Sequence, residues 1–109
     1  MPLDKSLVSG STTMLILRLL EEKDMYGYEM IENLKSRSNN VFELKAGTLY
    51  PLLHSLEEKK YLTAYEKEVG GKMRKYYRIT KEGIRCLKQK KEEWSEYSAA
   101  VLQVLSLEV

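Results

Sequence analysis

Residues 47–56 combine an apolar stripe with a polar face that carries no acidic side chain. Leucines at 49, 52, 53 and 56 follow the i, i+3, i+4, i+7 spacing of a short amphipathic helix. Ammonium, hydroxyl, phenol and imidazole groups on the other side could hydrogen-bond to phosphates or base edges. The candidates for such contacts are Lys45, Thr48, Tyr50, Pro51 and His54. Two of these residues have a structural alternative to such contacts. Tyr50 could pack at the edge of the core, and His54 could be an ordinary surface residue.

Pro51 limits where this helix can begin, because proline has no N–H to donate to the carbonyl four residues back. With Thr48 as N-cap, Pro51 would lie in the first turn, where such donors are unpaired anyway. A helix that begins earlier should have a first turn distorted around Pro51. Either start predicts that Thr48 and Tyr50 point outward.

Positive charge is concentrated after this helix. From Lys72 to Lys91 nine cations stand against one anion, whereas the first sixty residues carry eight cations and nine anions. A nearly neutral body with one basic stripe suits a polyanionic partner. The candidate contacts are Lys72, Arg74, Lys75 and Tyr76. Arg74 and Lys75 could instead be ordinary solubilising residues, and residues 88–91 a solvated helix face.

The N-terminal part must position these groups, and its spacing predicts two helices. The first covers about residues 7–22, residues 23–25 form a turn, and a second helix follows over 26–34. Gly27 would let this second helix approach a neighbour closely. Residues 36–40 end it, since asparagine tolerates the left-handed conformation. Three loop hydrophobes, Val41, Phe42 and Leu44, are expected to reach the core.

Alternating residues on both sides of Gly70-Gly71 predict a β-hairpin, because paired glycines supply the positive φ angles of a tight turn. A two-stranded ribbon is marginal alone. We therefore expect it to pack on the helices through Leu62, Tyr77 and Ile79. Since Tyr76 and Tyr77 alternate in face, one of them should lie in the core.

Thr80 should cap a long final helix. From residue 81 to 109 it would span about 43 Å, more than a core of some eighty residues can cover. A symmetric homodimer is the default way to bury the remaining apolar stripe, although part of it could pack on the first helix. The residues expected at the dimer interface are Leu87, Trp94, Val101, Leu102 and Leu105.

These elements predict a mostly α fold with a two-stranded β-wing (α+β). Residues 1–80 would form a winged helix-turn-helix DNA-binding domain, and residues 81–109 a C-terminal dimerisation helix. The longest apolar run is ended by Arg18, well short of a membrane span, and the N-terminus lacks a secretion signal, so a cytoplasmic protein is expected. One histidine and one cysteine make a metal site, a cofactor or catalysis unexpected. Cys86 is expected to be a small, partly buried hydrophobe, with a redox-sensing thiol as the alternative.

The chain resembles the PadR family of bacterial transcriptional regulators over essentially its whole length. Three segments carry the likeness, namely residues 25–29 (MYGYE), 47–53 (GTLYPLL) and 70–83 (GGKMRKYYRITKEG). With a single helix after the wing, the chain is similar to the short branch of that family, whose members have one C-terminal helix. The resemblance implies a homodimeric repressor of an inverted-repeat operator in double-stranded DNA. The alternative is a winged-helix protein-interaction module that does not bind DNA.

Multidrug-binding members of this family hold flat aromatic compounds between tryptophans of the final helices. By resemblance, Trp94, Tyr97 and Ser98 would form a site for a small aromatic or phenolic effector. Ser98 departs from the pattern, since those members have an acidic residue there. A tryptophan that only packs the dimer interface is the alternative.

Overall fold

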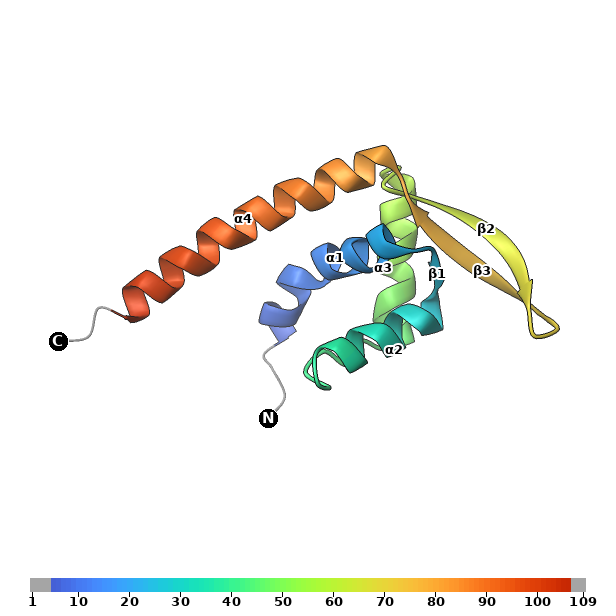
Figure 1. The fold of residues 1–109 in the computed structure, drawn as a ribbon, viewed down its shortest axis with the longest axis horizontal. Coiled ribbons are helices and arrows are strands. Elements are labelled where there is room, and N and C mark those ends of the chain that lie inside the picture. Colours follow the sequence, from blue (N-terminus) through green and yellow to red (C-terminus); the bar gives the residue numbers. More distant parts are fainter. Residues whose placement is uncertain (1–4, 107–109) are drawn as a thin grey trace.

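Four helices and three strands follow one another in residues 5–106, the part of the chain that the computed structural model describes. Three helices pack together, a β-ribbon projects on one side, and the long last helix extends to the other (Figure 1). The elements are α1 (Lys5–Glu22), β1 (Met25–Tyr26), α2 (Gly27–Arg37), α3 (Ala46–Glu58), β2 (Leu62–Val69), β3 (Lys72–Ile79) and α4 (Lys81–Leu105). The predicted helices, hairpin and fold class are confirmed, with one strand more than expected. No helix in this part has the length and apolarity needed to span a bilayer.

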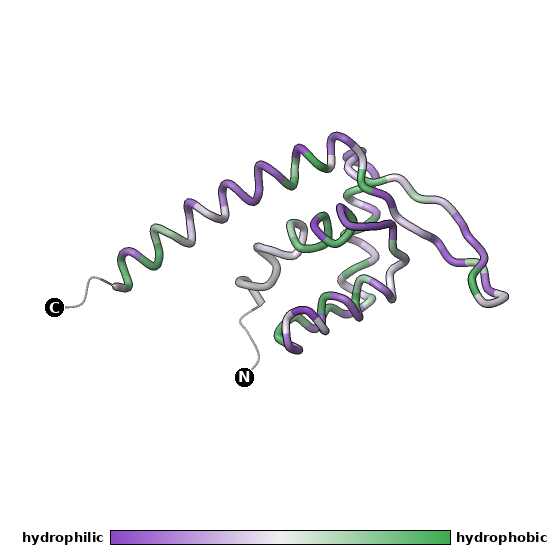
Figure 2. Tube along the Cα trace, viewed as in Figure 1, coloured by the Kyte–Doolittle hydropathy of each residue, from purple (hydrophilic) through white to green (hydrophobic). Residues whose placement is uncertain are grey.

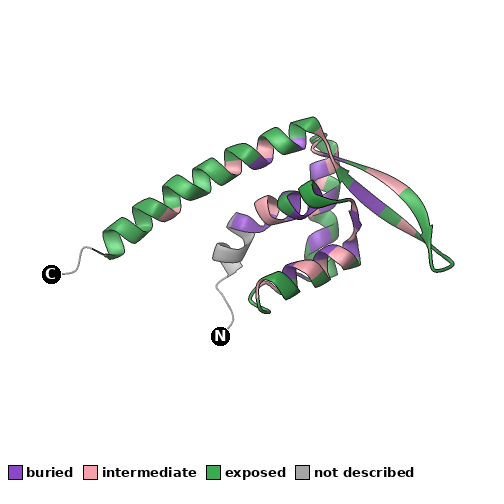
Figure 3. Ribbon diagram, viewed as in Figure 1, coloured by how far each residue is buried: buried purple, intermediate pink, exposed green. Residues whose placement is uncertain are grey.

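The core lies where α1, α2 and α3 meet the base of the sheet. Its fully buried large side chains are Ile16, Leu17, Leu20, Met25, Met30, Leu49, Leu53, Leu62, Tyr77 and Leu87. Figure 3 shows the buried positions gathered on the facing sides of these elements. The leucine spacing of α3 therefore identified its buried face correctly.

Two asparagines end the second helix as expected. Asn39 and Asn40 have φ angles of 51° and 67°, in the left-handed region that asparagine tolerates. Leu44 is buried and Phe42 packs against the core beyond this turn. Val41, however, is 52% exposed, so its predicted insertion is wrong. Val41 belongs to the turn that follows α2, where its N–H donates to the Ser38 carbonyl at 3.0 Å.

The sheet has three antiparallel strands in the order β1-β3-β2, so the predicted two-stranded wing was incomplete. Met25 was predicted to lie in the turn at 23–25 and Tyr26 to begin the second helix, but the two residues pair with Tyr77 and Tyr76 of β3. Met25 is fully buried in the core. A two-residue strand is too short to reveal itself by alternation, which is why the sequence did not predict it.

Both tyrosines of β3 are buried, on opposite faces of the sheet. Tyr77 is 1% exposed and belongs to the core, as predicted for one of the pair. Tyr76 is 8% exposed on the outer face. There it stacks on Tyr65 (ring centroids 5.7 Å apart) and meets the ring of Tyr26 edge-on (5.4 Å).

The predicted glycine turn joins β2 to β3. Gly70 and Gly71 have φ angles of 58° and 80°, and Val69 pairs with Lys72 across them. Positive φ at both central residues is the conformation of a two-residue type I′ hairpin. This turn fixes the register of the whole ribbon.

Thr80 caps α4, as predicted. Its hydroxyl accepts a hydrogen bond from the Gly83 N–H at 3.0 Å and donates one to the Lys60 carbonyl at 2.7 Å. Gly83 lies so close to the preceding turn that an added Cβ would contact the Tyr61 carbonyl oxygen and come within 2.7 Å of Cγ1 of Ile79. The start of α4 is thus tied to the end of α3 and to β3.

Only the first part of α4 packs against its own chain. Leu87 is 1% exposed in the core, so its predicted place in a dimer interface is wrong. The first part of α4 packs on α1, as was expected for part of its apolar stripe. From residue 91 to residue 106 nearly every residue is exposed (Figure 3). Figure 2 shows that hydrophobic residues return at the C-terminal end of this exposed stretch.

Replacement of Gly83 by alanine should lower the free energy of unfolding by about 1–3 kcal/mol, because the new methyl group must displace backbone as well as the Ile79 side chain. Gly47→Ala is the matched control. No atom lies within 4 Å of a Cβ built there, and alanine should stabilise that helix by up to about 1 kcal/mol. Urea unfolding followed by circular dichroism measures both. Wild-type stability of Gly83→Ala would contradict the close contact.

Candidate nucleic-acid interface

The recognition-helix candidate α3 begins earlier than the threonine cap predicted. Lys45 is the N-cap residue, and its carbonyl accepts hydrogen bonds from the N–H groups of Thr48 (3.0 Å) and Leu49 (2.9 Å). The prediction of Thr48 as N-cap is therefore wrong. Pro51 lies inside the helix and cannot donate to the Gly47 carbonyl. The three-residue hydrogen bond from Thr48 to Lys45 is a contact common at helix N-termini. The distortion expected around Pro51 stays a prediction.

One side of α3 is open to solvent and free of acidic residues. Its exposed positions in the first three turns are Lys45, Ala46, Gly47, Thr48, Tyr50, Pro51 and His54. We call these residues the α3 face. The residues of the first turn, Lys45 to Thr48, also stand where the helix dipole favours an anion.

Tyr50 has a second role besides its place on the α3 face. A Cβ built on Gly27 of α2 would contact the Tyr50 hydroxyl oxygen and lie 2.7 Å from its Cζ. The phenol ring therefore lies directly across α2, while 37% of Tyr50 stays exposed. The close approach predicted at Gly27 is confirmed. Tyr50 joins the two helices, which agrees with the alternative of a residue at the core edge.

Strand alternation divides the wing into two faces. On the inner face, Nζ of Lys75 lies 3.4 Å from Oε1 of Glu57 on α3 and 5.3 Å from the ring centre of Tyr77. Partial burial works against the charge on Lys75, but Tyr77 and Glu57 outweigh it and raise the pKa of the ammonium group. Lys75 therefore stays charged and is partly neutralised by Glu57.

On the outer face, cations lie over tyrosine rings. Arg74 lies 4.5 Å from the ring centre of Tyr26, and Lys67 lies 5.3 Å from that of Tyr76. Arg78 likewise lies 5.1 Å from the ring centre of Tyr65. Stacking of this kind favours a cation and restricts its orientation. We call Lys67, Lys72, Arg74 and Arg78 the wing cations.

Tyr76 does not belong to the candidate contact surface, contrary to the prediction. Its ring is covered by Tyr26, Tyr65 and Lys67, which leaves 8% of the residue exposed. A side chain buried in this way cannot reach a phosphate. Its role in the structure is to support the rings on which the cations lie.

Lys67 was missed by the sequence analysis, which looked only after the glycine turn. Register places Lys67 directly opposite Arg74, and counting back from Gly70-Gly71 would have found it. The charge count from Lys72 to Lys91 also omitted Glu66 and Glu68 of β2. These two lie opposite Lys75 and Met73, and alternation directs them to the inner face. The wing as a whole is less basic than residues 72–91, but its outer face gathers the positive charge.

The α4 residues predicted to bind a ligand lie on its exposed half. Trp94 is 50% and Tyr97 62% exposed, with ring centroids 6.1 Å apart. Ser98 is half-buried and its hydroxyl donates to the Ser95 carbonyl at 3.3 Å. The predicted interface residues Val101, Leu102 and Leu105 are 37%, 64% and 65% exposed. Within one chain, these groups form an open surface.

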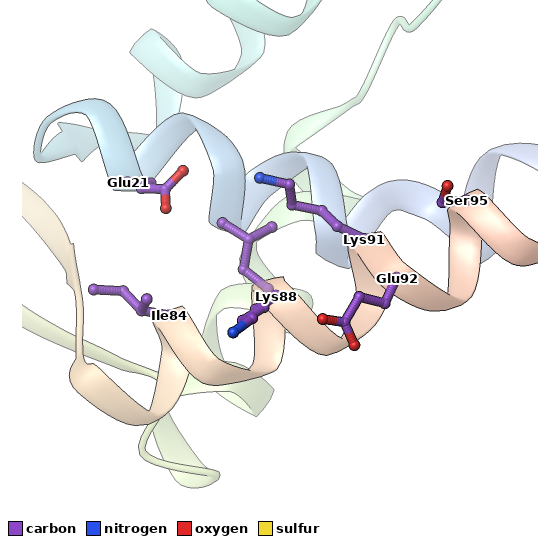
Figure 4. A pocket seen from close by; sticks show the side chains of 7 residues that line it. Glu21, Ile84, Lys88, Lys91, Glu92 and Ser95 are labelled. Carbon is purple, nitrogen blue, oxygen red and sulfur yellow. The ribbon is translucent and has the colours of Figure 1, made fainter.

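A groove runs between α1 and α4 (Figure 4). Its lining residues are Glu21, Ile84, Leu87, Lys88, Lys91, Glu92 and Ser95. Trp94 is not among them, so the structure does not bring the predicted ligand residues into this groove. Over residues 5–106, no three histidine, cysteine, aspartate or glutamate side chains come together as a metal site.

Known proteins are similar to this chain in sequence, in fold or in both. An uncharacterized protein of Lysinibacillus sphaericus is 45% identical over 92 residues, which cover 83% of this chain and 84% of that protein. A transcriptional regulator from Clostridium thermocellum superposes with a TM-score of 0.84 at 38% identity, covering 90% of this chain and 96% of that one. A PadR family transcriptional regulator from Eggerthella lenta gives 0.83 at 34% identity, covering 94% and 88%.

The family assignment comes from the sequence itself. The sequence profile described as the transcriptional regulator PadR-like family matches residues 16–89, a segment that contains α2, α3 and the whole wing. That segment holds the α3 face and the wing cations. The chain therefore belongs to the PadR-like family, a family of transcriptional regulators and not of enzymes.

Proposed function

We propose that this regulator binds double-stranded operator DNA through the α3 face and the wing cations. The observation that carries the proposal is that an acid-free helix face and a cationic ribbon face belong to elements that are in contact in the fold, α3 and the wing. A helix fits the major groove of B-DNA, where residues of its first turns meet base edges. The wing would lie along the phosphates beside that groove.

The residues divide between positioning and sequence reading. Lys45, Lys72, Arg74 and Lys75 would contact phosphates, which orients the protein without selecting a sequence. Thr48, Pro51 and the exposed edge of Tyr50 are close enough to the helix start to meet base edges or thymine methyl groups. His54, exposed further along α3, would reach a base or a phosphate.

A homodimer would bury the exposed half of α4. The side chains from Trp94 to Leu105 that stay half or more exposed form a large apolar surface, and monomeric proteins rarely leave such a surface open. We propose that residues 81–109 act as the dimerisation helix and residues 1–80 as the DNA-binding domain. Two-fold symmetry would then present two α3 faces to an inverted repeat with half-sites about one helical turn apart. Bound at such an operator, the dimer would act as a repressor.

Trp94 and Tyr97 support a second part of the proposal. Two aromatic side chains exposed on a helix that pairs with its own copy could enclose a flat aromatic or phenolic effector between the protomers. Ser98 provides a hydroxyl beside them. Binding there would alter the separation of the two α3 faces and release the operator.

A winged-helix module that binds another protein is the competing function. Such a module has no need for an acid-free α3 face beside oriented cations, which is the feature that favours DNA. The two functions are separated by the dependence of binding on salt, because contacts to phosphates release condensed counterions.

Alanine at Lys72 or Arg74 should weaken binding to every DNA sequence and lower the slope of log affinity against log salt by about one unit each. Lys75→Ala should have a smaller effect, because Glu57 already neutralises part of that charge. Lys88→Ala, on α4, is the control and should bind like the wild type. Fluorescence anisotropy with a labelled duplex over a range of salt concentrations measures this. Unchanged slopes in the wing variants would refute the phosphate contacts.

Leu102→Glu should convert a dimer into a monomer, because it places a charge in the apolar surface of α4. Gln103→Glu adds the same charge at the next exposed position and should leave the dimer intact. Sedimentation equilibrium gives the mass of each variant. A wild-type protein that sediments as a monomer would contradict the proposed assembly.

A planar aromatic dye should quench tryptophan fluorescence at micromolar concentration. Trp94 is the chain's single tryptophan, so the signal reports this position alone. The Leu102→Glu variant should lose the response if the dye is held between two protomers. Absence of quenching in the wild type would favour a tryptophan that serves only the interface.

A further inference from the structure

Asp24 connects the turn between α1 and α2 to both strands of the wing. A single carboxylate oxygen, Oδ2, accepts a hydrogen bond from the Tyr65 hydroxyl at 2.6 Å. The same oxygen lies 3.1 Å from Nε and 3.0 Å from Nη2 of Arg78. Since Tyr65 belongs to β2 and Arg78 to β3, the carboxylate spans the ribbon at its base. Bonds of this charge-assisted kind are shorter and stronger than neutral ones.

Both donors, the Tyr65 phenol and the Arg78 guanidinium, are favoured in their protonated forms. The hydrogen bond to Asp24 raises the pKa of the Tyr65 phenol and that of the Arg78 guanidinium. Arg78 also lies over the Tyr65 ring, which in turn stacks on Tyr76. The Asp24 side chain is 25% exposed, so this contact is only partly open to solvent.

From Asp24 the chain leads directly to the contact between α2 and α3. Met25 and Tyr26 form β1, which pairs with β3, and Gly27 begins α2. Gly27 is the residue against which Tyr50 of α3 lies. The three residues after Asp24 therefore join the base of the wing to the α3 face.

Beyond its base, the wing has little support from the rest of the chain. All residues from 66 to 73 are exposed. From Tyr65 to Gly70 the ribbon extends about 17 Å, so a rotation of about 10° at the base would move the tip by about 3 Å. A displacement of that size is as long as a hydrogen bond. The angle at the base decides whether the tip reaches a phosphate.

We propose that Asp24 is a positioning residue for DNA binding, which holds the wing at the angle that lets the wing cations and the α3 face engage one duplex. The proposal rests on the DNA-binding function proposed above. The direction of the change in DNA affinity distinguishes a positioning role from a simple charge effect. An anion near DNA repels phosphate, so its removal should strengthen binding if charge alone matters. Loss of a positioning residue weakens binding instead.

The test compares Asp24→Asn with Glu68→Gln, which removes the same charge from an exposed position of the wing. The probe is a duplex enriched from a random library by the wild-type protein, and anisotropy is measured over a range of salt concentrations. Glu68→Gln should bind as tightly as the wild type or more tightly. Asp24→Asn should bind about tenfold more weakly, with a shallower salt slope, because a displaced wing contacts fewer phosphates.

Two further variants show whether the effect passes through the wing. In a Lys72→Ala background, Asp24→Asn should cost less affinity than it does in the wild type, because the wing contact is already weakened. Tyr65→Phe keeps every charge and the ring stack but removes one donor, and should bind about two- to threefold more weakly. Circular dichroism and thermal melting establish that each variant is folded. Tyr65→Phe replaces Asp24→Asn in the comparison if the latter does not fold.

A folded Asp24→Asn protein that binds the duplex as tightly as the wild type, or more tightly, overturns the positioning role. The role is also overturned if the affinity losses of Asp24→Asn and Lys72→Ala are fully additive. If Asp24→Asn does not fold, wild-type affinity of the Tyr65→Phe variant overturns it. Failure of the wild-type protein to enrich any duplex is a different result. It would remove the proposed DNA-binding function itself.

Discussion

Strand β3 is covered on both faces at Tyr76 and Tyr77, and most of the molecule is arranged around this part of it. Tyr77 fills the core on one side, while Tyr76 lies beneath tyrosine rings and a lysine on the other. The strand pairs with β1, which leads into α2, and with β2, which follows α3. It ends at Thr80, the cap of α4. A ribbon that would be marginal alone is thereby fixed to three helices at once.

This arrangement places cations where they lose little freedom on binding. Arg74 already lies over the ring of Tyr26, so fewer side-chain rotamers would be frozen when a phosphate binds. Arg78 lies over Tyr65 but is paired with Asp24. Arginine keeps its donors in a fixed plane, which suits an oriented contact with phosphate oxygens. On the inner face, Lys75 is held by Glu57 of α3 instead. The outer face therefore offers the available positive charge, beside an α3 face that has no acidic group to oppose it.

Local patterns in the sequence predicted the elements, but contacts between distant residues decided details of the site. The leucine spacing of α3, the Gly70-Gly71 turn and the Thr80 cap each depend on a few neighbouring residues, and all three were correct. The burial of Tyr76 and Leu87 depends on strands and helices far apart in the sequence, so both were assigned to surfaces that the fold closes. Lys67 was missed because its place opposite Arg74 arises from strand register. Asp24 was missed because its side chain contacts Tyr65 and Arg78, which are far from it in the sequence.

Binding of DNA by paired α3 faces is the central claim, and hydroxyl-radical footprinting tests it most directly. The duplex enriched by the wild-type protein should show two protected segments related by a two-fold axis and centred about 10–11 base pairs apart, or a multiple of that distance. The wings should protect backbone at the outer edge of each segment. One protected segment only, or two without symmetry, would contradict a dimer that presents two equivalent heads to the operator.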